Sequence, residues 1–479
     1  MYGDHGLYID GSWRPAVSGD TYGVVNPADE EPLGEAPAAG PADVEAAIAA
    51  AERALASWRE TQSWERARII RRIGELLAER AGAIARVLTL EVGKPLAQAE
   101  REVQLAADQF EWYAEETKRL YGQIVESRLP GGRIQVTARP VGVVAAFTAW
   151  NFPVLLLARK IAPALAAGCS VICRPSIEAP GSAMALIQCC HDAGAPAGLV
   201  NLLTGKASAV APGLMASPAV RKISLTGSTE IGKRMIKDAA DTVKRVTMEL
   251  GGHAPVIVFD DADAEAVAEM TVPVKFANTG QVCVSPSRFF VHESKTEAFA
   301  RRFAEATGRL RIGNGLDPET QLGPLSTEKR RRETEALVAD TESSGARLLT
   351  GGRRPAAFNR GYFYEPTVFD NVPDDARIMR EEPFGPVVPI TVFRDFNDVI
   401  ERANALPLGL SAYVFTRSLK TAHEAADAIE SGMVGVNTYG LAQAEAPFGG
   451  IKESGFGREG GSLGVRDYLD VKYTHMVMA

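Results

Sequence analysis

The stretch VGVVAAFTAWNFPVLLLARKIAPALAAGCSVICRPS, residues 141–176, decides the fold class of this chain. A valine-rich run (141–148) is followed by the helix-like LLLARKIAPALAAG (155–168) and then by a second apolar run (170–176). Short apolar runs that alternate with longer helical segments are typical of a parallel, doubly wound α/β sheet. The alternation continues to residue 240, so the sequence predicts an α/β fold.

The segments on either side extend this prediction. Residues 42–119 carry apolar side chains at three- and four-residue spacing and are expected to be helical. A second series of strands and helices begins after Glu249 and runs to about residue 440. The C-terminal DYLDVKYTHMVMA alternates polar and apolar residues, which predicts a strand that pairs with another element, in this chain or in a partner chain.

Length and composition limit the possible classes of protein. A chain of 479 residues is too long for one compact core, so two or three domains are expected. Its 52 basic and 60 acidic residues give a net charge of −8, which argues against nucleic acid as a partner. No uncharged apolar run approaches the roughly 18–20 residues of a membrane helix. The N-terminus lacks a signal-peptide pattern, so we expect a cytoplasmic protein.

The five cysteines are few and odd in number, which indicates a reducing compartment without a disulfide framework. Four of them, Cys169, Cys173, Cys189 and Cys190, lie in apolar strand-like or helical segments. They contain no CxxC pair, so we interpret them as buried small apolar side chains and expect no metal site.

Cys283 has different surroundings. It lies in FANTGQVCVSPSR (276–288), a small, turn-prone stretch between apolar segments. Such a setting favours a nucleophile, because a thiol is strongly nucleophilic once its proton is removed; a buried inert cysteine is the alternative. Glu249 precedes two glycines in MELGGHAP, where close approach is possible, and is a candidate base for the thiol or for water. The alternative for Glu249 is a solvated surface charge.

Further polar residues follow predicted strands, where open α/β sheets bind ligands. Asn151 in AWNFP has an amide that can stabilise an oxyanion, or it is a turn or helix-cap residue. Gly227 and Ser228 in LTGSTEIGK open a helix whose free N–H groups suit a phosphate, or they form an ordinary turn. REEPFGPV (380–387) is a rigid polar and aromatic turn that holds a ribose or is only a loop.

Together, the motifs FANTGQVC, MELGGHAP, TAWNFP, LTGST, EEPFGPV and APFGGIKESGFGRE resemble the aldehyde dehydrogenase superfamily over nearly the whole chain. The resemblance implies a Rossmann-like cofactor domain at 1–120 and 138–249 and an α/β catalytic domain at 250–450. It also implies a small β oligomerisation arm at 121–137 and 451–479, and therefore a homodimer or homotetramer.

The same resemblance implies the NAD(P)-dependent oxidation of a small-molecule aldehyde to a carboxylic acid. Cys283 would attack the aldehyde to give a thiohemiacetal, whose oxyanion is stabilised by Asn151 and by the Cys283 backbone N–H. Oxidation would leave a thioester that Glu249 hydrolyses by activating water, which favours release of a free acid. Lys160 matches a lysine that is usual after the WNFP turn and is counted with the catalytic residues.

The cofactor residues are implied in the same way. Glu382 looks like the residue that holds the nicotinamide ribose, with Phe384 packed beside it. Trp150, Gly227 and Ser228 resemble the adenine-side and pyrophosphate contacts.

RPSIEAP departs from the family pattern near the adenosine ribose. Arg174 replaces a lysine there, and Ile177 replaces the glutamate that binds the ribose hydroxyls in many NAD-preferring members. Arg174 and Ser176 are candidates to attract a 2′-phosphate. The cofactor is therefore expected to be NAD or NADP.

The C-terminal run is most similar to the succinate-semialdehyde dehydrogenase-like branch. Arg159 matches an arginine with which that branch binds the substrate carboxylate; the alternative is a helix-surface arginine that pairs with a neighbour. Phe448 is expected beside the substrate. Ala277 and Ala442 stand where the branch has a second arginine and a serine, and Ser285 excludes a local disulfide with the nucleophile.

Four hypotheses about the substrate and activity follow. The first is a semialdehyde such as succinate semialdehyde, bound through one guanidinium. The second is an aromatic or aliphatic aldehyde. Outside this chemistry, a cysteine esterase that uses Cys283 and Glu249, or a non-catalytic relative, are the alternatives.

Overall fold

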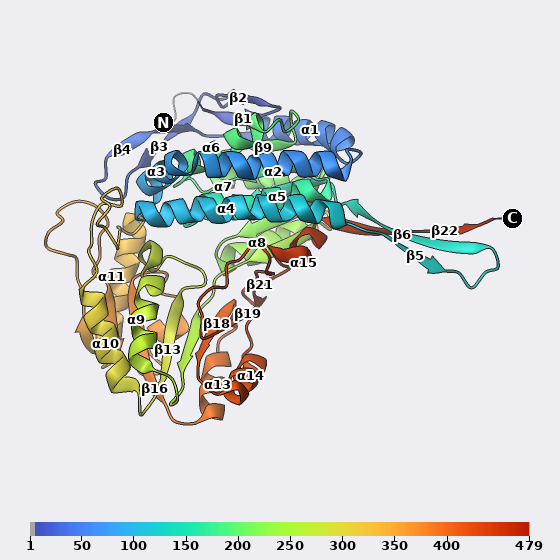
Figure 1. Ribbon diagram of the computed structural model, residues 1–479. Helices are drawn as coiled ribbons and strands as arrows, with labels where there is room; N and C mark the ends of the chain where they lie inside the picture. The colour runs from blue at the N-terminus through green and yellow to red at the C-terminus, as the bar shows by residue number, and fades with distance from the viewer. Residues whose placement is uncertain (1–4, 479) are drawn as a thin grey trace.

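The computed structural model of the chain describes residues 5–478. Figure 1 shows two sheet-and-helix lobes, one above the other, and a narrow β arm that projects from one side. Residues 1–4 and Ala479, which belong to the predicted domain ranges, lie outside the described part. No helix within residues 5–478 is both long enough and apolar enough to cross a membrane.

The first lobe is built on an eight-stranded sheet in the order β2-β1-β9-β8-β7-β10-β11-β21. The five strands from β9 to β11 are parallel, and the edge strands are antiparallel. The bounds are β1 Leu7–Ile9, β2 Ser12–Arg14, β7 Val143–Phe147, β8 Ser170–Arg174, β9 Val200–Leu202, β10 Val220–Thr226, β11 Arg245–Glu249 and β21 Gly455–Phe456.

Helices cover both faces of this sheet. The side chains of β7 alternate, so Val143 faces α1, α7 and α8, whereas Val144 faces α2, α4, α5 and α6. The helix bounds are α1 Pro41–Trp58, α2 Ser63–Glu79, α3 Ala81–Val92, α4 Leu96–Glu116, α5 Pro153–Ala167, α6 Pro180–Asp192, α7 Ala207–Ala216 and α8 Thr229–Ala240. The predicted doubly wound α/β fold is confirmed, as are the helices expected over residues 42–119.

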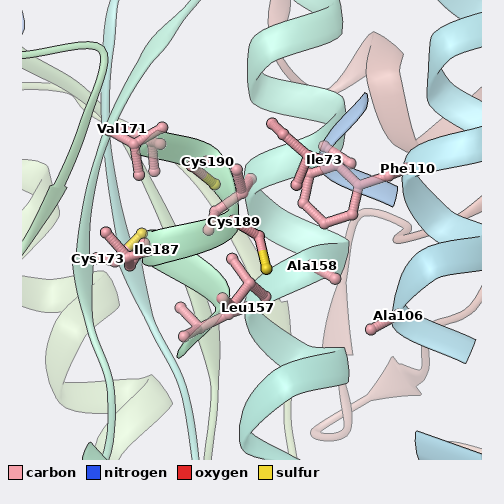
Figure 2. Packing of buried hydrophobic residues seen from close by; sticks show 14 of the residues in the cluster. Ile73, Ala106, Phe110, Leu157, Ala158, Val171, Cys173, Ile187, Cys189 and Cys190 are labelled. Carbon is pink, nitrogen blue, oxygen red and sulfur yellow. The ribbon is translucent and has the colours of Figure 1, made fainter. Parts of the chain in front are cut away.

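Figure 2 shows the core on the face covered by α5 and α6. Cys173, Cys189 and Cys190 lie among Ile187 and other apolar side chains. All three cysteines are fully buried, as is Cys169, so their interpretation as small apolar core residues is confirmed.

The second lobe contains a seven-stranded sheet in the order β14-β15-β16-β13-β12-β18-β19, parallel except at β14. Helices again cover both faces, with α9 and α10 on one side and α11, α13 and α14 on the other. The strand bounds are β12 Ala254–Val258, β13 Pro286–His292, β14 Arg347–Thr350, β15 Thr367–Asp370, β16 Val387–Phe393, β18 Ser411–Phe415 and β19 Met433–Val436. The helices are α9 Ala264–Lys275, α10 Thr296–Gly308, α11 Glu328–Ser343, α12 Arg377–Arg380, α13 Phe396–Asn404 and α14 Leu419–Ala428.

The arm is a three-stranded antiparallel sheet in the order β22-β6-β5. Its strands are β5 Gln123–Glu126, β6 Gly132–Pro140 and β22 Leu469–Val477, so the predicted C-terminal strand pairs within its own chain. Between β20, Ile451–Lys452, and β22 the chain returns to the first lobe, where β21 joins the sheet and α15, Gly461–Arg466, contacts α4 and α5. The division of the chain into domains stays a prediction.

The remaining elements are short connections between the larger ones. They are the strand pairs β3 Thr21–Val25 with β4 Pro32–Pro37 and β17 Leu408–Gly409 with β20 Ile451–Lys452, and the 3₁₀ turns η1 Thr117–Arg119 and η2 Ala277–Gly280.

Candidate active site

The segment that carries Cys283 is tightly bent. In η2, Asn278 and Thr279 adopt left-handed backbone angles, with φ of 47° and 58°, which cost free energy for residues with a side chain. At Gly280, φ is 75° and a Cβ atom would lie 2.2 Å from the carbonyl oxygen of Gly385. Only glycine allows this close approach of the Cys283 segment to the EEPFGPV loop.

Glu249 ends β11 in the first lobe, whereas Cys283 precedes β13 in the second lobe. The two side chains meet between the lobes, close enough for each to influence the pKa of the other. Glu249 is only 2% exposed, and its Oε1 has no hydrogen-bond partner among residues 5–478. The fold therefore brings together the two residues that the sequence proposed as nucleophile and base.

Burial sets the protonation of this pair. Burial, together with the nearby charge of Glu459, raises the pKa of Glu249 to about 7. Burial also raises the pKa of the Cys283 thiol well above its ordinary value, with the Glu249 charge adding to the effect. Near neutral pH the thiol thus holds its proton, while the carboxylate beside it is poised to accept one.

Asn151 lies in the loop between β7 and α5, and its amide Nδ2 donates to the Gln281 carbonyl at 3.2 Å. The Lys94 Nζ also holds this loop, because it donates to the Asn151 backbone carbonyl at 2.7 Å. Lys94 and Glu102 form an ion pair without solvent exposure. One N–H of the Asn151 amide remains for a ligand, because an amide nitrogen carries two donors.

Lys160 lies on α5 and is fully buried. It donates to Thr226 Oγ1 at 2.8 Å and forms an ion pair with Glu459. The charge of Lys160 lowers the pKa of Glu249. Sequence reasoning missed Glu459, although it ends the quoted motif APFGGIKESGFGRE.

Arg159, one residue earlier on α5, is 3% exposed, yet its Nε and Nη2 atoms have no partner within the described chain. Its guanidinium carbon lies 4.0 Å from the centre of the Phe448 ring. The Arg159 charge lowers the pKa of both Cys283 and Glu249, which places it beside the reactive pair. The structure thus brings Arg159 and Phe448 together, as the sequence proposed.

A cavity of about 930 Å³ lies at the carboxyl ends of β7, β8 and β10. Arg174, Ser176, Gly227 and Ser228 line it, so four of the proposed cofactor residues surround one space. Ser228 caps α8 by accepting a hydrogen bond from the Ile231 N–H at 3.4 Å. The volume of the cavity and the N-terminus of α8 beside it fit a nucleotide with a pyrophosphate group.

The other three proposed cofactor residues lie outside the residues that line this cavity. Trp150 and Phe384 pack edge to face, with ring centres 5.7 Å apart. Glu382 packs against Gly251, where a Cβ atom would lie 2.9 Å from its Oε2. Burial raises the pKa of Glu382 to about 8.

Arg330 of α11 holds the Glu382–Phe384 loop and was missed by sequence reasoning. Its Nη2 donates to the carbonyls of Pro383 at 3.1 Å and Phe384 at 3.0 Å. Phe384 needs this support because its φ of 38° is unfavourable for a residue with a side chain. No motif signal in the sequence pointed to Arg330.

Two doubly wound lobes, with a nucleotide-sized cavity in one and a cysteine–glutamate pair between them, define an enzyme that uses a nucleotide cofactor. Residues 13–474 match the aldehyde dehydrogenase family, and the chain belongs to that family. It is an NAD(P)-dependent aldehyde dehydrogenase that oxidises an aldehyde to a carboxylic acid.

Named relatives are similar over almost their full length. Succinate-semialdehyde dehydrogenase GabD of Escherichia coli (strain K12), named for NADP(+), is 44% identical and covers 97% of this chain and 96% of its own. The 3-sulfolactaldehyde dehydrogenase of Pseudomonas putida shows the same identity and coverage. The crystal structure of succinate-semialdehyde dehydrogenase from Burkholderia pseudomallei matches with a TM-score of 0.97 at 42% identity, covering 99% of this chain and 98% of that one.

Proposed function

We propose that the substrate is an aldehyde that carries a second, anionic group, such as a semialdehyde, and that Arg159 binds the anion. The observation that carries this proposal is the buried guanidinium of Arg159, whose Nε and Nη2 have no partner among residues 5–478. Leaving a buried charged donor unsatisfied costs at least about 1–3 kcal/mol. A bound carboxylate or sulfonate would satisfy two donors at once.

The pocket around Arg159 and the named relatives support this substrate class. The Phe448 ring lies within cation–π distance of the guanidinium, whose Nε and Nη2 donors remain for an anion. The residues at 277 and 442 are alanines, so they offer no further side-chain donor. Two relatives are named for succinate semialdehyde and 3-sulfolactaldehyde, which are both anionic aldehydes.

Within this proposal, Glu249 accepts the thiol proton as the Cys283 sulfur attacks the aldehyde carbon. The Asn151 amide and the Cys283 backbone N–H stabilise the oxyanion of the thiohemiacetal. The oxidant would be NAD or NADP, whose nicotinamide ring would take a hydride from the substrate carbon, so that the oxidised substrate would remain on Cys283 as a thioester. The thiol proton then passes from Glu249 to solvent, and the free carboxylate accepts a proton from the water that attacks the thioester, so that the acid leaves and the Cys283 thiolate takes up a proton again.

Other residues hold the groups in place. Lys160 and its partner Glu459 set the charge around Glu249. The residues that would hold the cofactor are Trp150, Arg174, Ser176, Gly227, Ser228, Glu382 and Phe384.

The test compares matched substrates with Arg159 variants. Wild-type kcat/KM is expected to favour succinate semialdehyde over butanal, and 4-carboxybenzaldehyde over benzaldehyde. In Arg159→Leu, kcat/KM for the anionic member should fall about 10–150-fold, the value of a charged hydrogen bond. The neutral member should change much less.

The matched control is Arg101→Leu, which removes an exposed arginine from α4. It distinguishes binding at Arg159 from general attraction of anions to the surface. Equal loss for neutral and anionic substrates in Arg159→Leu, or wild-type preference for a neutral aldehyde, would reject the proposal.

The arm supports a homodimer or homotetramer. Val471 and Tyr473 on β22 are 78% and 70% exposed, and Ile124 on β5 is 75% exposed. Apolar side chains on open edge strands favour pairing with another copy of the chain. Light scattering after size exclusion should give a molar mass of two or four times 51.2 kDa, and the Val471→Asp variant should have a lower molar mass. A monomeric wild-type protein would contradict this.

The five free cysteines support the expected cytoplasmic location.

A further inference from the structure

Arg174 and Ser176 follow β8 and line the nucleotide cavity. Both were candidates to attract a 2′-phosphate, but in the structure both are already engaged. The Arg174 Nε and Nη2 atoms donate to the Gly205 carbonyl at 3.2 and 2.8 Å. The Ser176 hydroxyl donates to the carboxylate of Glu178.

The arginines at the cavity also have acidic neighbours. Burial lowers the pKa of the Arg174 guanidinium, and the charge of Glu178 opposes this, so the two groups interact. The second arginine that lines the cavity, Arg234, lies 4.0 Å from Asp238. Each arginine at the cavity therefore has an acidic neighbour, and no surplus positive charge is left for an additional phosphate.

We infer that Glu178 makes the ribose end of the cavity selective for NAD over NADP. Dinucleotide sites commonly read the 2′-hydroxyl of NAD with a carboxylate, and accommodate the 2′-phosphate of NADP with an arginine. A 2′-phosphate beside Ser176 would face the Glu178 carboxylate and would find the serine hydroxyl already donating to it. Two like charges at short range repel strongly where water is partly excluded.

Glu178 acts here as a positioning and charge-setting residue, because the cavity-lining group is Ser176. Its effect must therefore differ between the two cofactors. This inference depends on the established use of NAD or NADP and not on the identity of the aldehyde, so it is tested without substrate.

The experiment is calorimetric titration of the full-length protein with NAD and with NADP. Wild type should bind NADP at least about tenfold more weakly than NAD, which corresponds to one unfavourable charge contact. Glu178→Gln keeps an oxygen that accepts from Ser176 but removes the charge. It should reduce the NADP/NAD ratio of dissociation constants about fivefold to tenfold, mainly through tighter NADP binding.

The control variant is Glu45→Gln, which makes the same change in net charge on exposed α1. If it reproduces the shift, the effect is one of bulk charge and the inference fails. Wild-type preference for NADP would also overturn it, as would an equal change for both cofactors in Glu178→Gln.

A second measurement needs no substitution and remains decisive if Glu178→Gln does not fold. Added salt screens repulsion and attraction alike. If Glu178 repels the 2′-phosphate, raising the salt concentration should reduce the NADP/NAD ratio of dissociation constants in wild type. If Arg174 attracts the 2′-phosphate instead, the ratio should increase.

Discussion

Polar side chains differ in their hydrogen bonding between the reactive pocket, which contains Cys283, Glu249, Asn151 and Arg159, and the nucleotide cavity. In the pocket, buried atoms of Arg159, Asn151 and Glu249 lack partners among the described residues. In the cavity, Arg174 donates to a backbone carbonyl and Ser176 to a carboxylate. The groups that we propose to react with or bind the substrate keep free hydrogen-bonding capacity, whereas the groups that we propose to select the cofactor are fixed in advance by their neighbours.

Removing the nucleophile should separate the two regions most sharply. Cys283→Ala should lower kcat by at least about 10³-fold, because no other side chain provides the covalent step. Calorimetric NAD affinity should stay within about threefold, since Cys283 is not among the residues proposed to hold the cofactor.

Absorbance at 340 nm measures the first effect, and titration with NAD measures the second. Retained aldehyde oxidation in Cys283→Ala would show that the pocket does not react through this thiol. Lost NAD binding would show that the pocket and the cavity are not separate.

The second prediction distinguishes formation of the thioester from its hydrolysis. Glu249→Gln removes the base that activates water, so kcat should fall about 100-fold. The thiol can also lose its proton to solvent, whereas the attacking water depends on the base, so the thioester should accumulate and rapid mixing should show a burst of reduced cofactor near one per active site. A decrease in rate without a burst would place the role of Glu249 before thioester formation, as base for the thiol.

The pH dependence of wild type should report the same carboxylate. Burial raises the pKa of Glu249 to about 7, and only its ionised form accepts a proton. Below that pH, kcat should therefore fall about tenfold per pH unit, and above it kcat should level off. Glu249→Gln should lose this slope, and a flat wild-type profile between pH 5 and about 8 would contradict the assignment.

Local patterns predicted much of this molecule. The alternation over residues 141–176 predicted the parallel sheet because buried strands and amphipathic helices have distinct periods. The surroundings of Cys283 and the glycines after Glu249 indicated a reactive pair, and the structure brings these residues together. The catalytic and binding roles themselves stay predictions.

Contacts between distant residues could not be predicted in the same way. Lys160 and its partner Glu459 are 299 positions apart, and no local pattern pairs them. Lys94 and Glu102 lie in the region predicted to be helical, but no local pattern showed that both are buried or that Lys94 donates to the Asn151 carbonyl. Residues 455–456 were expected in the arm, but they pair with β11, which depends on how the whole chain folds back.

The smallest expected effect concerns the third region, the loop that Arg330 supports. Arg330→Ala removes two hydrogen bonds to the backbone of Pro383 and Phe384, each worth about 0.5–1.5 kcal/mol. The affinity for NAD should then fall about fivefold to tenfold, whereas AMP, which needs only the cavity, should bind as before. Calorimetric titration with both ligands measures the difference, with Arg332→Ala on the exposed face of the same helix as the matched control. Equal weakening of AMP and NAD would mean that Arg330 supports the fold rather than the loop. If the affinity for NAD alone falls, Phe384 is a cofactor-binding residue that its neighbour Arg330 holds in place. The arrangement seen at Arg174 and Ser176 would then extend to this loop.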